Sequence, residues 1–228
     1  MDDESALEFV EQYFGNGSRL TEIYTRLQHP AMKSDILRYL LLFVYGGIYS
    51  DLDTAILRPI AEWIPMELQD HVRLLIGIEY DRRTDSAYPG MAYWVQFCQW
   101  TIAATPGHTI LRDMIAHSLE SIEDLAKTYG RSIEELDPTD DEVARATGPV
   151  GWTEVCFNHM QKVDPSLQFL EDLSLMGELR LVGDVLVLGI NSFGMGQPHS
   201  GSQRDGTPPH QALVRHLFHG SWKKDWMG

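Results

Sequence analysis

The sequence predicts a single α/β domain, and three segments carry that prediction. Residues 34–45 (SDILRYLLLFVY) are almost all apolar over three helical turns, which indicates a buried helix. Residues 73–79 (RLLIGIE) have the composition of a strand. Residues 105–130 repeat apolar side chains every three to five positions, which indicates a long helix. A chain of 228 residues with 43% hydrophobic content can bury one sizeable core, so we expect one domain.

The first part of the chain is expected to be helical. Apolar side chains recur at helical spacing through residues 3–14, and Gly15 follows as a stop signal. A second helix is expected to begin after Ser18, an N-cap candidate, and Pro30 is expected to end it. The buried helix 34–45 then leads into the segment that carries the chemistry.

Residues 48–53 (IYSDLD) have strand character after a glycine pair that ends the buried helix. Alternation along a strand places Tyr49, Asp51 and Asp53 on one face. The expected elements after this strand are a loop at 81–90, an ambiguous strand or helix at 94–104, a solvated acidic loop at 134–142, a helix at 152–163, a hairpin of 179–182 with 185–190, and a long loop at 191–209.

The charge balance limits the ligands. With 33 acidic and 18 basic residues the net charge is −15, which repels a polyphosphate backbone, so nucleic acid is not expected as a partner. A sugar nucleotide is expected to bind only where a metal ion or a focused basic group reverses the local potential. We expect these residues to be soluble, because no run approaches the roughly 20 apolar residues of a membrane helix and residues 1–9 lack the basic flank and apolar run of a signal peptide.

The pair Asp51 and Asp53 is the strongest chemical signal. Two carboxylates on one face repel one another and are costly to desolvate unless a cation or hydrogen-bond donors lie between them. A divalent metal ion satisfies both carboxylates and leaves coordination positions for diphosphate oxygens. The alternative is an acidic pair beside a turn, exposed to water.

Asp35 and Arg38 lie three positions apart on the otherwise apolar helix. A surface ion pair is one interpretation and contributes little to stability. The other is a pair that points into a cleft, where Arg38 meets phosphate oxygens and Asp35 meets a hydroxyl. In the loop 81–90, Asp81 and Asp85 could face an acceptor, although a solvated loop is the favoured interpretation.

Six segments carry a further likeness: 33–39 (KSDILRY), 45–53 (YGGIYSDLD), 77–79 (GIE), 99–101 (QWT), 147–149 (TGP) and 216–223 (HLFHGSWK). Together they resemble glycosyltransferase family 32, most of all its fungal initiation-specific alpha-1,6-mannosyltransferases. They occur in the family's order and cover nearly the whole chain. The resemblance implies a GT-A-like (Rossmann-like) nucleotide-diphospho-sugar transferase fold, with residues 1–228 as one catalytic domain.

The resemblance implies a metal site. Asp53 is similar to the family's metal-ligating carboxylate, and His216 to the histidine that completes the metal and diphosphate site. His219 competes with His216 for that role. Asp51 is similar to the residue that contacts the ribose or sugar of the donor. An imidazole beside carboxylates suits Mn²⁺, or Mg²⁺ as the second choice, but from the residues alone a histidine near a terminus is more often structural.

The resemblance also implies a donor site. Asp35 and Arg38 match positions that bind the donor sugar and diphosphate, and Trp222 matches the tryptophan that packs over the nucleotide. The expected catalytic residues are thus Arg38, Asp51 and Asp53. No carboxylate has a placement that identifies it as a nucleophile.

The activity that follows from the likeness is a metal-dependent, retaining transfer of mannose from GDP-mannose to a glycan acceptor, as in the building of N-glycan outer chains. Two alternatives stay open: a UDP-sugar-dependent hexosyltransferase of the same fold, and a catalytically silent module that binds sugar nucleotides or glycans. The partners expected are the donor and a glycan acceptor.

Family members have a strand upstream of residues 2–3 that forms one wall of the nucleotide pocket. An N-terminally truncated fold is therefore expected, either as a fragment or as a divergent member that binds its donor poorly. Relatives in the Golgi lumen also carry a membrane anchor and stem. The full-length form is expected to be membrane-associated there, through an anchor absent from these residues.

Overall fold

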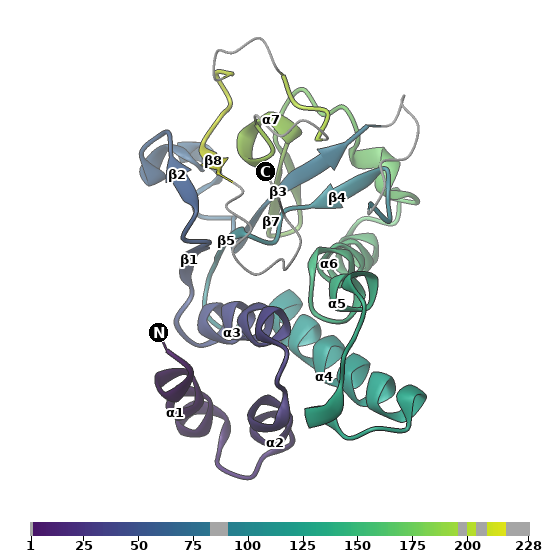
Figure 1. The fold of residues 1–228 in the computed structure, drawn as a ribbon. Coiled ribbons are helices and arrows are strands. Elements are labelled where there is room, and N and C mark those ends of the chain that lie inside the picture. The colour runs from purple at the N-terminus through teal and green to yellow at the C-terminus, as the bar shows by residue number, and fades with distance from the viewer. Residues whose placement is uncertain (1, 83–90, 196–199, 204–208, 218–228) are drawn as a thin grey trace.

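The computed structural model describes residues 2–82, 91–195, 200–203 and 209–217, which form a mixed sheet with helices (Figure 1). The strands are β1 (Gly47–Ser50), β2 (Thr54–Ile56), β3 (Leu74–Asp81), β4 (Val95–Phe97), β5 (Thr101–Ala104), β6 (Arg180–Val182), β7 (Val185–Leu188) and β8 (Val214–His216). The helices are α1 (Asp3–Phe14), α2 (Arg19–Arg26), α3 (Pro30–Tyr45), α4 (Thr109–Tyr129), α5 (Asp140–Ala146), α6 (Pro149–Val163) and α7 (Ile190–Phe193). The α/β class predicted from the sequence is confirmed.

Among the described residues the main sheet has the strand order β1-β5-β3-β7-β6, and β4 pairs with the end of β3. β1 and β3 both run antiparallel to β5, so they point in the same direction. β7 runs parallel to β3. The carboxyl ends of β1, β3 and β7 therefore meet at one edge of the sheet, which is where open α/β sheets bind ligands. A separate ribbon of β2 and β8 adjoins this edge (Figure 1).

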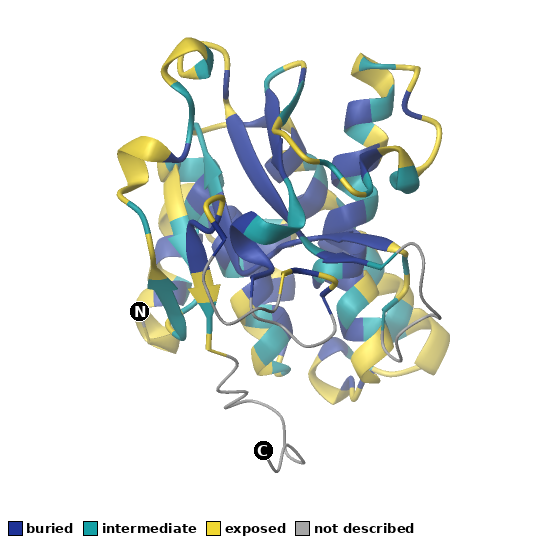
Figure 2. Ribbon diagram, turned by 90° about the horizontal axis from the view of Figure 1, so that it is seen from above, coloured by how far each residue is buried: buried dark blue, intermediate teal, exposed yellow. Residues whose placement is uncertain are grey.

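One face of the sheet is covered by α3, α4 and α6, which build the larger core. Tyr39 of α3 and Trp152 of α6 stack there with ring centroids 5.4 Å apart, and both are fully buried. The strands at the centre of the molecule are accordingly the buried part in Figure 2. α1 and α2 pack beneath α3, away from the sheet (Figure 1).

The other face of the sheet is covered by α7 and the segment around Trp63. Phe193 of α7 lies directly over Gly77 of β3, where an added Cβ would come within 2.4 Å of the phenyl ring. Trp63 and Trp100 also contact Phe193, with ring centroids 5.6 and 6.0 Å away. This second cluster supports the edge of the sheet on which Glu79 and Asp51 lie.

The strand predicted at 48–53 is wrong in its second half. β1 ends at Ser50, residues 51–53 form a turn, and β2 starts at Thr54. The Thr54 hydroxyl donates to the carbonyl oxygen of Asp51 at 2.7 Å and stabilises the turn. A turn, and not the alternation of a strand, therefore brings the two carboxylates together.

Helix starts differ from the prediction in three places. α3 begins at Pro30, because proline is accepted at the first helical position, where its missing N–H costs nothing. α4 begins at Thr109 instead of residue 105, since His108 is its N-cap and its Nδ1 accepts from the Ile110 N–H. α6 begins at Pro149, three residues earlier than predicted.

The acidic segment 134–142 is not a simple loop. It contains part of the 3-10 turn Ile133–Glu135 and the first turn of α5. Thr139 and Glu142 cap that helix reciprocally, so the sequence carried a capping-box signal that the prediction missed. Residues 94–104 are resolved as β4 and β5, and the β6–β7 hairpin is confirmed. The loop predicted at 191–209 starts with the short helix α7.

In the described ranges, every helix is too short or too polar to cross a membrane.

Asp81 was expected in a solvated loop, but it is the buried last residue of β3. Its carboxylate accepts hydrogen bonds from the Ser174 hydroxyl and from the Leu175 N–H, the latter at 2.6 Å. Leu175 has a φ of 53°, which is rare for a residue with a branched side chain. The role of Asp81 in this structure is to hold that turn against the end of β3.

Replacing Asp81 by alanine should remove the buried carboxylate that accepts from the Leu175 N–H and the Ser174 hydroxyl, and lower the free energy of unfolding by about 1–3 kcal/mol. Urea denaturation followed by circular dichroism measures the change. The exposed Asp70 is the control, since Asp70→Ala should change stability by no more than about 0.5 kcal/mol. Equal stability of the two variants would contradict the assigned role.

Candidate metal and donor site

The turn 51–53 lies where β1 leaves the main sheet for the β2–β8 ribbon. The Asp51 N–H donates to the carbonyl oxygen of Trp100 at 2.9 Å, which extends the β1–β5 pairing by one residue. Leu52 is fully exposed at the tip of the turn. The aspartates on either side of it are partly buried, so their carboxylates are directed toward the protein.

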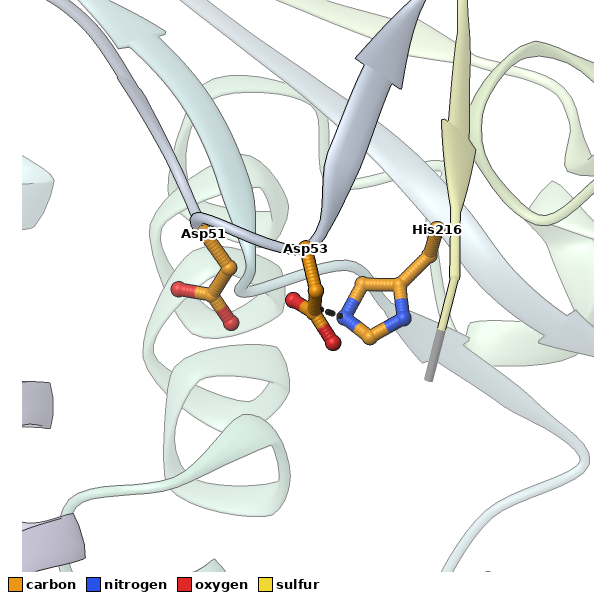
Figure 3. Close-up of side chains that lie close together, drawn as sticks. All are labelled: Asp51, Asp53 and His216. Atoms are coloured by element: carbon orange, nitrogen blue, oxygen red, sulfur yellow. Dashed lines mark ion pairs between the residues drawn. The ribbon is translucent and has the colours of Figure 1, made fainter. Parts of the chain in front are cut away.

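His216 reaches this turn from the other end of the chain. β2 and β8 pair antiparallel with Thr54 opposite His216, and the Leu217 N–H donates to the Asp53 carbonyl oxygen at 2.8 Å. The imidazole Nε2 lies 3.4 Å from Asp53 Oδ1 (Figure 3). The Trp100 ring packs edge-on against the imidazole with centroids 4.7 Å apart, which restricts its orientation.

Asp51, Asp53 and His216 form a potential metal site. Each offers a ligand atom, and these atoms lie within 4.8 Å of one another. Two carboxylates and an imidazole are a donor set that Mn²⁺ accepts, and Mg²⁺ is bound through carboxylates. The chemistry of the three side chains therefore fits a divalent ion with coordination positions left for a ligand.

Arg38 connects α3 to this turn. Its Nη1 donates to Asp35 Oδ1 at 2.6 Å, and its Nη2 lies 3.4 Å from Asp51 Oδ1. The Tyr49 hydroxyl donates to the same Asp51 oxygen at 2.8 Å. The guanidinium also lies over the Tyr49 ring, 5.1 Å from its centroid. Arg38 and Tyr49 together fix the Asp51 carboxylate.

Asp35 and Arg38 are both buried, so the interpretation as a surface ion pair is wrong. Burial raises the pKa of Asp35, although Arg38 and the Thr147 hydroxyl work to lower it. Burial works to lower the pKa of Arg38, but Asp35, Tyr49 and Asp51 raise it above its ordinary value, so the side chain stays charged. Among the described residues, Arg38 Nε has no hydrogen-bond partner.

The structure thus brings together five of the residues singled out from the sequence: Asp35, Arg38, Asp51, Asp53 and His216. Three other predicted positions, Trp222, His219 and Asp85, lie outside the described residues.

The sequence analysis assigned no function to three residues at this site: Glu79, Gln96 and Trp100. The Gln96 amide donates to Glu79 at 2.8 Å, and burial raises the pKa of Glu79 to about 7, although Gln96, Trp100 and Arg38 lower it. Asp51 also raises that pKa by like-charge repulsion. The sequence signal that could have identified Glu79 is its position as a lone carboxylate at the end of an apolar strand. A carboxylate is seldom buried in a protein interior without a partner.

Residues 2–70, which include Asp51 and Asp53, match the family described as the glycosyltransferase sugar-binding region containing DXD motif. The initiation-specific alpha-1,6-mannosyltransferase of Schizosaccharomyces pombe is 37% identical over 228 residues. Residues 2–70 therefore carry this family's DXD region, and nearly the whole chain is similar to a fungal initiation-specific alpha-1,6-mannosyltransferase. The resemblance inferred from the sequence is therefore confirmed.

The match to the S. pombe protein covers 99% of this chain and 56% of the relative. The Candida albicans protein of the same name is 31% identical over 96% of this chain and 60% of its own length. The chain therefore spans between half and two thirds of the length of these relatives. The solved structure of PaToxG glycosyltransferase is also similar, with 19% sequence identity and a TM-score of 0.38. The match covers 72% of this chain and 43% of the PaToxG chain. No residue role is transferred from that distant similarity.

The raised pKa of Glu79 makes stability depend on pH. The folded carboxyl holds its proton to about pH 7, whereas the unfolded one releases it near its ordinary value of 4.5. The native state thus binds more protons between these limits, and its stability falls as pH rises through them, by at most about 1.4 kcal/mol per pH unit.

Urea denaturation of metal-free protein from pH 4.5 to 7.5 measures this dependence. Glu79→Gln has no proton to release at this position. As pH rises from 4.5 to 7.5, the free energy of unfolding of the parent should therefore fall relative to that of the variant. Parallel curves for the two proteins would contradict the assignment.

Proposed function

We propose that this glycosyltransferase transfers mannose from GDP-mannose to a glycan acceptor in a metal-dependent reaction that retains configuration. The observation that carries the proposal is the convergence of Asp51, Asp53 and His216 beside the charged Arg38. The names of the relatives support mannose as the sugar and an alpha-1,6 linkage, as in N-glycan outer chains. We assign residues 1–228 to one GT-A-like catalytic domain.

Asp53 and His216 would hold the divalent ion, Mn²⁺ or Mg²⁺, together with Asp51. Such an ion supplies electrostatic stabilisation to the negative charge that develops on the leaving diphosphate. Arg38 would add a second positive charge at the same place, with its unpartnered Nε as one donor. Asp35 keeps the guanidinium in position through its 2.6 Å hydrogen bond and would also contact the donor.

The reaction proposed is same-face substitution at the anomeric carbon. A bond forms between the acceptor oxygen and the anomeric carbon as the bond from that carbon to the phosphate oxygen breaks. The electron pair stays on the diphosphate, and the acceptor proton passes to a diphosphate oxygen. No covalent enzyme intermediate is needed, and an alpha donor gives an alpha product.

Trp222 would pack over the nucleotide, an assignment based on resemblance alone. We also place the full-length protein in the Golgi lumen by the same resemblance. The proposed partners are a nucleotide-sugar donor and a glycan acceptor.

Replacing a metal ligand tests the proposal. Asp53→Ala and His216→Ala should each lower kcat for mannose transfer more than tenfold, which corresponds to more than about 1.4 kcal/mol of transition-state stabilisation. EDTA should abolish transfer, and added Mn²⁺ should restore it in the parent protein. Asp70→Ala, at an exposed position, is the control. A turnover of Asp53→Ala within tenfold of the parent would exclude Asp53 as a metal ligand.

The donor is tested by calorimetric titration with GDP and with UDP, each with and without Mn²⁺. We expect GDP to bind only in the presence of the ion, because its diphosphate needs the charge compensation. Preferential binding of UDP would instead indicate a UDP-sugar-dependent hexosyltransferase. Metal-dependent binding of GDP without turnover of GDP-mannose on any glycan acceptor would indicate a silent binding module.

A further inference from the structure

Glu79 lies at the same sheet edge as the turn 51–53. β1 and β3 point in the same direction, so Glu79, near the carboxyl end of β3, approaches the edge at which β1 ends. The register of β3 with β4 shifts between Ile78 and Tyr80, so simple alternation does not fix the direction of Glu79. Glu79 lies beside Trp100, which lowers the pKa of its carboxyl. Its side chain is deeply set, and the residue remains partly accessible.

Trp100 connects Glu79 to the metal site. The indole packs against His216 at 4.7 Å and also acts on the Glu79 carboxyl, whose pKa it lowers. Arg38 and Asp51 act on the same carboxyl through their charges. Glu79 is thus within electrostatic reach of both halves of the donor site.

Three buried polar side-chain atoms here lack a hydrogen-bond partner within the part of the chain that the structure describes: Gln96 Oε1, Arg38 Nε and Trp100 Nε1. Gln96 donates its amide N–H to Glu79, which leaves Gln96 Oε1 without a hydrogen-bond partner, and that residue is 2% exposed. Arg38 Nε is the second such atom, on a residue that is 6% exposed. An unsatisfied buried polar group costs about 1–3 kcal/mol, so these atoms are prepared to bond a ligand.

We infer that Glu79 and Gln96 form a subsite that binds hydroxyl groups of the hexose being transferred. This inference rests on the proposed function. Glu79 and the free oxygen of Gln96 present adjacent hydrogen-bond acceptors, which match neighbouring hydroxyl donors. Above the Glu79 pKa of about 7 the carboxylate is negatively charged, so this pair repels a phosphate, whereas Arg38 and the metal cluster attract it. This difference in charge and hydrogen bonding places the hexose over Glu79 and the diphosphate over Arg38.

The subsite predicts that Glu79 distinguishes a sugar nucleotide from the bare nucleotide. With Mn²⁺ present at pH 8, above the Glu79 pKa of about 7, Glu79→Gln should weaken binding of GDP-mannose more than tenfold and change the Kd of GDP less than twofold. Glutamine has the size of glutamate, but it lacks the charge and presents one acceptor oxygen instead of two. Calorimetric titration of parent and variant with both ligands measures the two effects separately.

The exchange variant Glu79→Gln/Gln96→Glu is the matched control. It keeps an amide and a carboxylate in hydrogen-bonding distance but moves the charge to position 96. If the pair only supports the fold, the exchange restores GDP-mannose affinity to within twofold of the parent, and the inference is wrong. We expect affinity to stay at least tenfold weaker, with the thermal unfolding temperature close to that of the parent.

The remaining outcomes are also decisive. Equal weakening of GDP and GDP-mannose by Glu79→Gln would assign Glu79 a structural role and overturn the subsite alone. Unchanged binding of GDP-mannose would do the same. Failure of the parent protein to bind GDP, GDP-mannose, UDP or UDP-glucose with Mn²⁺ would overturn the proposed function, and the subsite with it.

Discussion

The buried guanidinium of Arg38 is the interaction on which the site depends. A charge placed this deep in a protein costs several kcal/mol unless it is paired and hydrogen-bonded. Asp35 lies on the same helix at 2.6 Å, and Asp51 lies across the sheet edge at 3.4 Å. The desolvated charge thus connects helix α3 to the turn that carries both aspartates. Removing Arg38 would leave Asp35 buried without its counter-ion, so the loss would extend beyond one phosphate contact.

A second constraint is the closure of the site by the end of the chain. His216 reaches Asp53 because β8 pairs with β2, and Trp100 limits where the imidazole can turn. Glu79 and Gln96 come from β3 and β4, and Trp100 acts on the Glu79 carboxyl as well as packing against His216. The metal ligands and the Glu79 carboxyl therefore come from separate parts of the fold and share Trp100 as an aromatic neighbour.

Local patterns predicted most of the elements. The apolar helix ending at Tyr45, the long helix ending at Gly130 and the hairpin around Gly183 were found because periodicity and glycine stops are properties of short segments. The errors fell where a tertiary contact overrides such a pattern. Residues 48–53 satisfy strand alternation, yet the Thr54 hydroxyl and the pairing of β2 with β8 turn the chain at Asp51.

The sequence by itself determined the residue types of the site and their likeness to DXD-containing glycosyltransferases, because spacing along the chain and family blocks are visible there. Only the tertiary structure decided that Asp35 and Arg38 are buried, that Asp81 supports the fold, and that Glu79 lies near Arg38 and Asp51. The physical reason is that burial, charge pairing and pKa depend on what surrounds a side chain in space. Those surroundings are assembled from segments as far apart as residues 53 and 216.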